Sequence, residues 1–311
     1  MLARRYPKMQ IVANAKTFPM MEQFFNLDVS DRKVVVAEGD TLNLGKHTLQ
    51  FFMAPMVHWP EVMVEYESTE KVLFSADGFG TFGALGDRLK TSELENMPQS
   101  WADEARRYFI NIVGKYGVQV QNLLKKAATL EIKMICPLHG PVWRENLGWF
   151  IEKYDTWSSY KPEDQAVMIA YASIYGNTEN AAEILASKLA DKGVKNIAMY
   201  DVSVTDPSVI VSESFRCSHL VFAAPSYNGG IFTKMETVLS ELKAHSLQNR
   251  TVAIMENGTW APVAGRQMRE IFASMKNIEL LEEGVTIRSA VKEAQEASLE
   301  ALAEKIASSL Q

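Results

Sequence analysis

Cysteine is scarce in this sequence, and long uncharged apolar runs are absent. The two cysteines, Cys136 and Cys217, form neither a CxxC pair nor a disulfide framework, which favours a reducing compartment. No apolar run approaches the roughly 20 residues of a transmembrane helix. The basic N-terminal residues are not followed by the apolar core of a signal peptide. These absences predict a soluble protein of the cytoplasm.

Positive charge is not in excess either. The chain has 32 basic and 38 acidic residues, and its net charge of −6 argues against nucleic acid as the main partner. The motif GxxxxGK[ST] is absent from the chain, and residues 163–311 contain no GxGxxG, which argues against a nucleoside triphosphate and a dinucleotide as ligands of that part. At 311 residues the chain is long enough for two domains with separate cores.

The chain is predicted to divide near residue 160, at the proline-containing charged segment KPEDQ (161–165), into domains 1–162 and 163–311. Beyond this segment, short apolar runs alternate with helical patterns. The runs are residues 166–172, 196–202, 219–225, 251–256 and 284–288. Continuous apolar strands separated by amphipathic helices are typical of a parallel sheet covered on both faces. The second domain is therefore predicted to be a doubly wound α/β domain with strand order 2-1-3-4-5.

Polar loops follow the first, third and fourth of these runs. In the predicted strand order these three strands are adjacent, so their carboxyl-end loops converge on one edge of the sheet. The candidate binding residues are Ser173, Ile174, Tyr175, Gly176, Asn177, Thr178, Pro225, Ser226, Tyr227, Asn228, Gly229, Gly230, Asn257, Gly258, Thr259 and Trp260.

The first loop, SIYGNTE (173–179), offers hydroxyl and amide donors at a helix start but no lysine or arginine. This chemistry suits a terminal phosphate monoester. In the other loops, glycines permit close approach to a flat ring, and Tyr227 and Trp260 offer faces to stack on it. A phosphate at one end and an aromatic ring at the other describe FMN. The alternative is a hydroxyl-rich helix cap and ordinary turns without a ligand.

Ser173, Gly176 and Thr178 resemble the phosphate loop of the flavodoxin family, which reads hydroxyl-x-x-Gly-x-Thr after the first strand. The resemblance implies that these three residues contact the phosphate of FMN.

In the first domain, His58, Asp77 and His139 each stand just after an apolar run, where strands commonly present ligands. Imidazole and carboxylate are suitable ligands for zinc or non-haem iron. Taken singly, each residue has an alternative interpretation as a hydrogen-bonded histidine or a turn aspartate.

The order of these segments resembles the flavodiiron (A-type flavoprotein) family. The most specific pieces are MVHWPE (56–61), SADGFG (75–80), PLHGPVWR (137–144), SIYGNTE (173–179) and ENGTWAP (256–262). The resemblance implies a metallo-β-lactamase-like αββα sandwich that holds two irons, followed by a flavodoxin-like FMN domain. It implies that His58 binds one iron, that Asp77 bridges both, and that His139 binds the second.

The family's H-x-E-x-D-H motif is not found in the sequence. The resemblance therefore predicts an incomplete lactamase-like domain, with too few ligands for two irons and a loosened, association-prone fold. An incomplete gene is the favoured explanation; a companion polypeptide and a degenerate metal half are the alternatives.

For the activity, the resemblance implies electron transfer from FMN to a di-iron site, with reduction of O2 to water or of NO to N2O. It further implies rubredoxin or a flavin reductase as the electron donor and a head-to-tail homodimer. Two other functions stay open. One is an FMN electron-transfer module with a degenerate metal half, and the other is a metallo-hydrolase.

Overall fold

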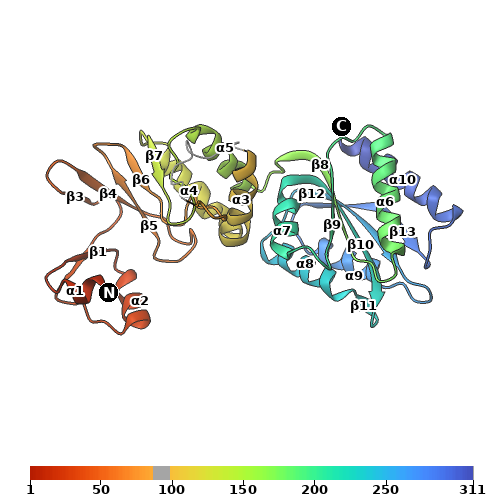
Figure 1. Cartoon of the computed structure of the whole chain (residues 1–311), viewed down its shortest axis with the longest axis horizontal. Helices are drawn as coiled ribbons and strands as arrows, with labels where there is room; N and C mark the ends of the chain where they lie inside the picture. The colour runs from red at the N-terminus through yellow and green to blue at the C-terminus, as the bar shows by residue number, and fades with distance from the viewer. Residues whose placement is uncertain (87–98, 311) are drawn as a thin grey trace. The chain divides into compact units, whose positions relative to one another are not determined.

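The computed structural model describes residues 1–86 and 99–310. The chain forms two compact units, Met1–Ser158 and Ser159–Gln311, each with its own sheet (Figure 1). Within the described residues, no helix is long and apolar enough to cross a membrane.

The second unit contains a parallel five-stranded sheet in the order β13-β12-β10-β8-β9. The strands are β8 (Asp164–Tyr171), β9 (Ile197–Asp201), β10 (Cys217–Tyr227), β12 (Arg250–Asn257) and β13 (Ile278–Ile287). Read from the second strand outward, this order is 2-1-3-4-5. The predicted doubly wound topology is confirmed, and the carboxyl ends of β8, β10 and β12 lie side by side.

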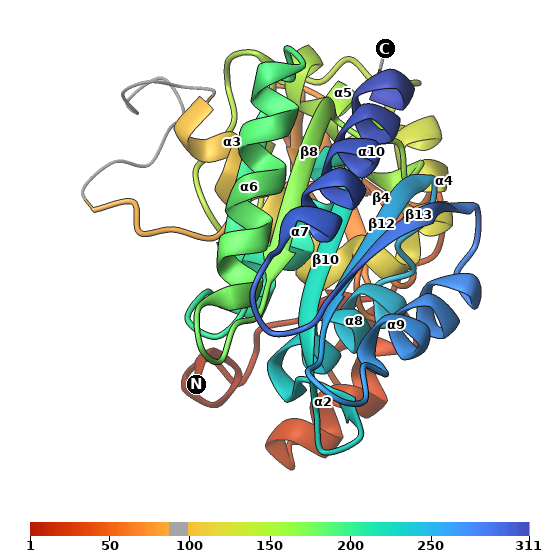
Figure 2. The ribbon, with the colours of Figure 1, turned by 90° about the vertical axis from the view of Figure 1, so that its right-hand side faces the viewer.

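Helices cover both faces of this sheet. Figure 2 shows α6 and α10 on one face, with α8 and α9 on the other. The helices of the unit are α6 (Asn177–Asp191), α7 (Pro207–Arg216), α8 (Thr233–Ala244), α9 (Ala264–Ala273) and α10 (Glu293–Leu310). Between α6, α10 and the sheet, Ile169, Leu185, Val221 and Leu302 are fully buried in one cluster. Each such side chain contributes about 1.5–3 kcal/mol by leaving water.

Two segments of this unit differ from the prediction. Residues 226–232, predicted as a loop, contain the short strand β11 (Gly230–Ile231), which pairs antiparallel with the end of β10. Asn228 and Gly229 have positive φ angles of 49° and 73°, which a two-residue hairpin turn requires. The last strand begins at Ile278, before the predicted 284–288, because the exposed glutamates of an edge strand interrupt its apolar pattern.

The first unit holds two sheets. Strands β1 (Ile11–Ala13) and β2 (Lys33–Val35) pair in parallel. The larger sheet has the order β3-β4-β5-β6-β7, antiparallel except for the parallel pair β6-β7. Its strands are β3 (Thr41–Asn43), β4 (Thr48–Met53), β5 (Met63–Glu67), β6 (Val72–Phe74) and β7 (Met134–Cys136).

The described part of this unit also contains five α-helices, one π-helical turn and one 3₁₀ turn. They are α1 (Leu2–Arg5), α2 (Thr17–Phe25), α3 (Gln99–Tyr108), a π-helical turn (Phe109–Val113), a 3₁₀ turn (Gly114–Tyr116), α4 (Gly117–Ala127) and α5 (Leu147–Ser158). The aromatic residues of α5 form the centre of the core. Phe150 and Tyr154 are fully buried and contact the ring of Phe79, which follows β6.

The two faces of the larger sheet differ in burial. Because neighbouring strands keep cross-strand partners on the same face, Val64, Tyr66, Leu73 and Ile135 can be assigned to the buried face. On the opposite face, called here the half-exposed sheet face, Phe51 is buried, but most apolar side chains are only partly covered, and Phe74 is 43% exposed. Its partly covered residues are Leu49, Met53, Met63, Val72, Phe74, Met134 and Cys136.

Candidate functional site

The first polar loop connects β8 to α6 and begins with a buried hydroxyl. Ser173 Oγ is buried and has no hydrogen-bond partner within the described part of the chain. Gly176 is the residue before α6, has a φ of 83°, and supplies no side chain to cap the helix. Thr178, in the first turn, is 2% exposed. The loop thus presents an unpaired hydroxyl next to the N–H groups of a helix start, which together suit an anion.

The single charged side chain of this loop is held by the adjacent strand. Tyr171, at the end of β8, donates a hydrogen bond of 3.0 Å from its hydroxyl to Oε1 of Glu179. Burial and this hydrogen bond raise the pKa of Tyr171 to about 12, so the phenol keeps its proton at neutral pH. The carboxylate is therefore engaged on the strand side of the helix.

A pocket of about 470 Å³ lies at the carboxyl ends of β8, β10 and β12. Its size is in the range of small-molecule sites. The pocket is lined by Ile174, Tyr175, Asn177, Thr178, Pro225, Ser226, Tyr227, Asn228, Gly229, Asn257, Gly258, Thr259, Trp260, Ala261, Val263 and Ser289. Trp260 is 86% exposed and Tyr175 is 89% exposed, so two aromatic rings stand at the pocket with little packing around them.

Most of the sequence-predicted binding residues line this pocket. Ser173, Gly176 and Gly230 do not line it, although the first two belong to the same loop as Asn177 and Thr178. The sequence analysis missed Ala261, Val263 and Ser289. Ser289 follows the carboxyl end of β13, so applying the strand-end rule to the fifth strand would have identified it.

Residues 257–263, called here the ring loop, are held to β13 at their first end. The side chain of Asn257 donates to the carbonyl of Ser289 at 2.9 Å and accepts from its N–H at 3.1 Å. The N–H of Gly258 donates to the carbonyl of Ile287, and Thr259 Oγ1 lies 2.7 Å from Ser289 Oγ. These bonds fix the start of the loop and leave the Trp260 ring free.

The pocket fits FMN on three observations. The buried Ser173 hydroxyl lacks a partner that a phosphate oxygen would supply. The volume suits an aromatic ligand of this size. Exposed Tyr227 and Trp260 line the pocket from loops other than the phosphate loop and offer faces on which a flat ring can stack.

In the first unit the structure brings His58, Asp77 and His139 together from three separate connections. His58 follows β4, Asp77 follows β6, and His139 follows β7. Nε2 of His58 lies 3.6 Å from Oδ2 of Asp77, and Nε2 of His139 lies 3.5 Å from Oδ1. Each imidazole thus faces a different oxygen of the one carboxylate. Ala76, just before Asp77, has a φ of 52°, a left-handed conformation that is uncommon for alanine and is found in functional loops.

Tyr108 also contacts this carboxylate, and sequence reasoning missed it. Its hydroxyl donates a hydrogen bond to Asp77, and its ring centroid lies 5.7 Å from that of His139. Burial, together with the negative charge of Asp77, raises the pKa of the Tyr108 phenol. Tyr108 ends α3, directly before the π-helical turn, a feature found frequently at functional sites. No local pattern in the sequence connects it to Asp77.

The donors of the first unit do not by themselves fit a di-iron centre. A carboxylate with one imidazole at each oxygen supplies one nitrogen and one oxygen to each of two ions, and iron takes more ligands than two. Across residues 1–86 and 99–310, no group of three or more histidine, cysteine, aspartate or glutamate side chains is arranged to hold a metal ion.

Two family matches cover most of the chain. Residues 1–140 match the family described as ODP family beta lactamase, and residues 169–301 match the flavodoxin family.

The sequence is also similar to several curated proteins. An uncharacterised protein of Methanocaldococcus jannaschii is 32% identical over 261 residues, which are 84% of this chain and 65% of that protein. Rubredoxin-oxygen oxidoreductase of Megalodesulfovibrio gigas is 28% identical over 281 residues, 89% of this chain and 68% of that protein. The chain therefore spans about two thirds of the length of these relatives.

Solved structures agree with these matches. The rubredoxin oxygen:oxidoreductase of Desulfovibrio gigas superposes with a TM-score of 0.89 at 26% identity, covering 97% of this chain and 74% of that chain. The flavodiiron protein of Giardia intestinalis has the same fold, with a TM-score of 0.89 at 24% identity, over 96% of this chain and 73% of that chain.

The fold and the matches define a protein in which a beta-lactamase-like domain precedes a flavodoxin-like domain. The homologues and the structural neighbours that share this domain order are flavodiiron proteins.

Proposed function

We propose that the chain is an oxidoreductase that binds FMN at the carboxyl edge of its parallel sheet and serves the reduction of O2 to water or of NO to N2O. The observation that carries this proposal is the 470 Å³ pocket beside the unpaired Ser173 hydroxyl. Relatives named rubredoxin-oxygen oxidoreductase and nitric oxide reductase, the latter from Moorella thermoacetica at 26% identity, support the reaction class.

Ser173, Gly176 and Thr178 would hold the phosphate, with the N–H groups that begin α6. Tyr227 and Trp260 would contact the ring, and the ring loop would exclude water from one side of it. When bound, FMN would accept electrons from the donor and pass them on singly. The residues of this chain contribute binding, orientation and hydrogen bonds.

In the first unit, His58, Asp77 and His139 would hold part of an iron centre. The three-donor set favours a second candidate function, an FMN electron carrier whose metal half does not itself reduce the substrate. A metal content well below two irons per chain would favour this second function.

We further propose a cytoplasmic protein that receives electrons from rubredoxin or a flavin reductase and forms a head-to-tail homodimer. Exposed aromatic side chains on both units support such contacts. Phe24 and Trp59 lie near His58 with ring centroids 5.9 Å apart, and Trp260 stands at the pocket of the second unit. Exposed aromatic clusters are typical of association surfaces.

The proposal is tested by reconstituting the chain with FMN, reducing the bound flavin and then adding O2 or NO. A reduced sample that is kept anaerobic and receives neither gas is the control. The expected result is stoichiometric flavin uptake and flavin reoxidation that is faster than that of free reduced FMN. A chain that takes up no FMN would contradict the proposal, and one that takes up FMN but reoxidises no faster than free flavin would favour the electron carrier.

A further inference from the structure

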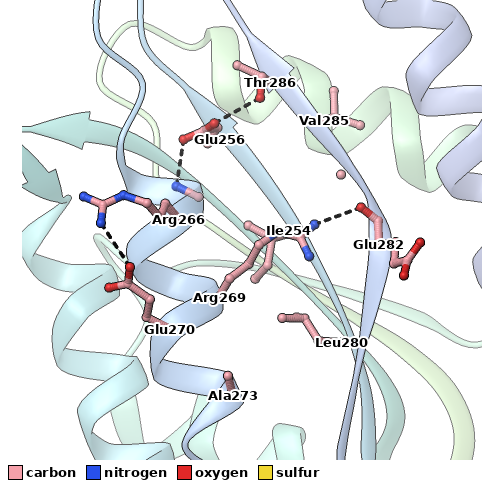
Figure 3. A pocket seen from close by; sticks show the side chains of 12 residues that line it. Ile254, Glu256, Arg266, Arg269, Glu270, Ala273, Leu280, Glu282, Val285 and Thr286 are labelled. Carbon is pink, nitrogen blue, oxygen red and sulfur yellow. Dashed lines mark hydrogen bonds and ion pairs between the residues drawn. The ribbon is translucent and has the colours of Figure 1, made fainter.

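The first residue of the motif ENGTWAP (256–262) does not line the flavin pocket. Asn257, Gly258, Thr259 and Trp260 line the flavin pocket, but Glu256, the last residue before them, does not. Its side chain instead lines a second cavity of about 590 Å³ between α9 and β13. Figure 3 shows the Glu256 carboxylate between the start of α9 and the strand that carries Thr286.

Both carboxylate oxygens of Glu256 have partners on different elements. Oε2 accepts a hydrogen bond of 2.7 Å from the N–H of Gly265, in the first turn of α9. Oε1 accepts a hydrogen bond of 3.0 Å from the hydroxyl of Thr286 on β13. A negative charge at a helix N-terminus is favourable, and hydrogen bonds to a carboxylate are stronger than neutral ones.

A glycine at the start of α9, Gly265, leaves room for this contact. A Cβ atom at position 265 would lie 2.8 Å from Cδ of Glu256, so any side chain there would require the Glu256 carboxylate to move. Glycine at this position therefore lets the carboxylate reach the backbone. The pairing of Glu256 with Gly265 is a close approach that another residue at 265 would disrupt.

These contacts determine where the ring loop ends. The loop begins at Asn257, directly after Glu256, and passes into α9 after Val263. Ser226 Oγ accepts from the N–H groups of Val263 and Ala264, at 2.9 and 3.2 Å, and Glu256 accepts from the next N–H, that of Gly265. With the Asn257–Ser289 bonds at the other end, the loop is fixed at both ends and carries Trp260 between them.

We propose that Glu256 is a positioning residue of the flavin site, which acts through the ring loop and touches no ligand itself. This inference rests on the proposed function, since it assumes that the pocket binds FMN. Loss of the Glu256 carboxylate would release the end of the loop and the start of α9, and the backbone that carries Trp260 would no longer be fixed at both ends. The phosphate loop, on β8 and α6, would keep its geometry.

The test compares Glu256→Ala, Glu256→Gln and Glu270→Gln in the full chain, with FMN and riboflavin as probes. Glu270 lines the same cavity but is exposed and pairs with Arg266, away from the ring loop, so Glu270→Gln is the matched control (Figure 3). Flavin fluorescence gives both dissociation constants, and the flavin absorption bands and midpoint potential report the surroundings of the ring.

Glu256→Ala is expected to weaken FMN and riboflavin alike by about 10-fold and to shift the absorption bands. Glu256→Gln should keep the wild-type flavin affinities and absorption bands. Its side-chain amide can accept a hydrogen bond from the N–H of Gly265 and donate one to the hydroxyl of Thr286. Glu270→Gln should match the wild type. If Glu256→Ala does not fold, Thr286→Val is the substitute, and it should weaken both flavins by about 3-fold.

Wild-type affinities and spectra in Glu256→Ala, or in its substitute Thr286→Val, would overturn the inference. So would a loss confined to FMN, and so would a Gln variant as weak as the Ala variant. These results differ from failure of the proposed function, in which the wild-type chain itself would bind neither flavin.

Discussion

The hydroxyl of Tyr171 donates a hydrogen bond to the carboxylate of Glu179, and this contact orders the only charged side chain of the phosphate loop. The loop holds its anion with neutral donors, so a free carboxylate nearby would oppose binding. The strand that precedes the loop thus also fixes where this carboxylate lies at the start of α6.

Tyr171→Phe is expected to weaken FMN by about 3-fold and to leave riboflavin unchanged, because only FMN carries the phosphate. Tyr200→Phe is the matched control, since Tyr200 makes the equivalent hydrogen bond to Glu213 at 3.1 Å, and neither residue lines the pocket. Fluorescence titration measures both flavins. Equal weakening of both flavins in Tyr171→Phe would refute this role for the contact.

Thr178→Val should also weaken FMN more than riboflavin, by about 10-fold for FMN, because it removes a buried hydroxyl at the start of α6. Gly176→Val should act in the same direction, since its φ of 83° is strained for a β-branched residue. Thr237→Val, on the exposed side of α8, serves as a control. Unchanged FMN affinity in both loop variants would show that this loop does not hold the phosphate.

Much of the second unit could be predicted from sequence because its strands are buried on both faces. Runs such as Val167–Ala170 are continuously apolar, and that signal is hard to mistake. The start of β13 was missed for the opposite reason. It is an edge strand, and Glu279, Glu282 and Glu283 are exposed on it, so its pattern resembles a loop.

Sequence patterns alone could not identify the site residues that depend on tertiary contacts. The three polar loops could be found because strand ends are visible in the sequence, and so could the strand exits that present His58, Asp77 and His139. Tyr108, at the end of α3, contacts Asp77, which follows β6, only through the tertiary fold, and no spacing rule gives that contact. Glu256 stands in a recognised motif, but its side chain contacts α9 and β13, not the flavin pocket.

The wild-type chain is expected to bind little iron. The three donors of the first unit are expected to bind less than about one iron per chain, because iron needs about four to six ligands. Asp77→Ala should abolish this binding, since Asp77 contacts both imidazoles, and His58→Ala should reduce it in part. His47→Ala, whose imidazole contacts Glu67 instead, is the control. Iron analysis after anaerobic loading gives the result, and two irons per wild-type chain would contradict the expectation.

The half-exposed sheet face is expected to cause self-association. Its apolar side chains span several strands, and a face of this kind is normally covered. Phe74→Lys should lower the weight-average mass in sedimentation at micromolar concentration. Val118→Lys is the control, because Val118 is exposed on the helix α4 and is not part of the sheet. If both variants sediment like the wild type, this face does not drive association.

The two units are expected to differ in their resistance to protease, because only the first has a partly covered sheet face. The second unit has both faces of its sheet covered, so limited proteolysis is expected to leave a flavin-binding fragment that begins near residues 159–165 while the first unit is cut. Mass spectrometry of the fragments identifies the boundary. Equal resistance of both units would show that the partly covered sheet is stable without a partner.

The most direct test of the account is a paired titration of the wild-type chain with FMN and riboflavin. The account predicts about one FMN bound per chain, quenched flavin fluorescence, and an affinity for FMN at least about 100-fold above that for riboflavin, because several hydrogen bonds hold the phosphate. Equal affinities for the two flavins, or no binding of either, would contradict the assignment of the pocket beside Ser173 and Thr178 as an FMN site.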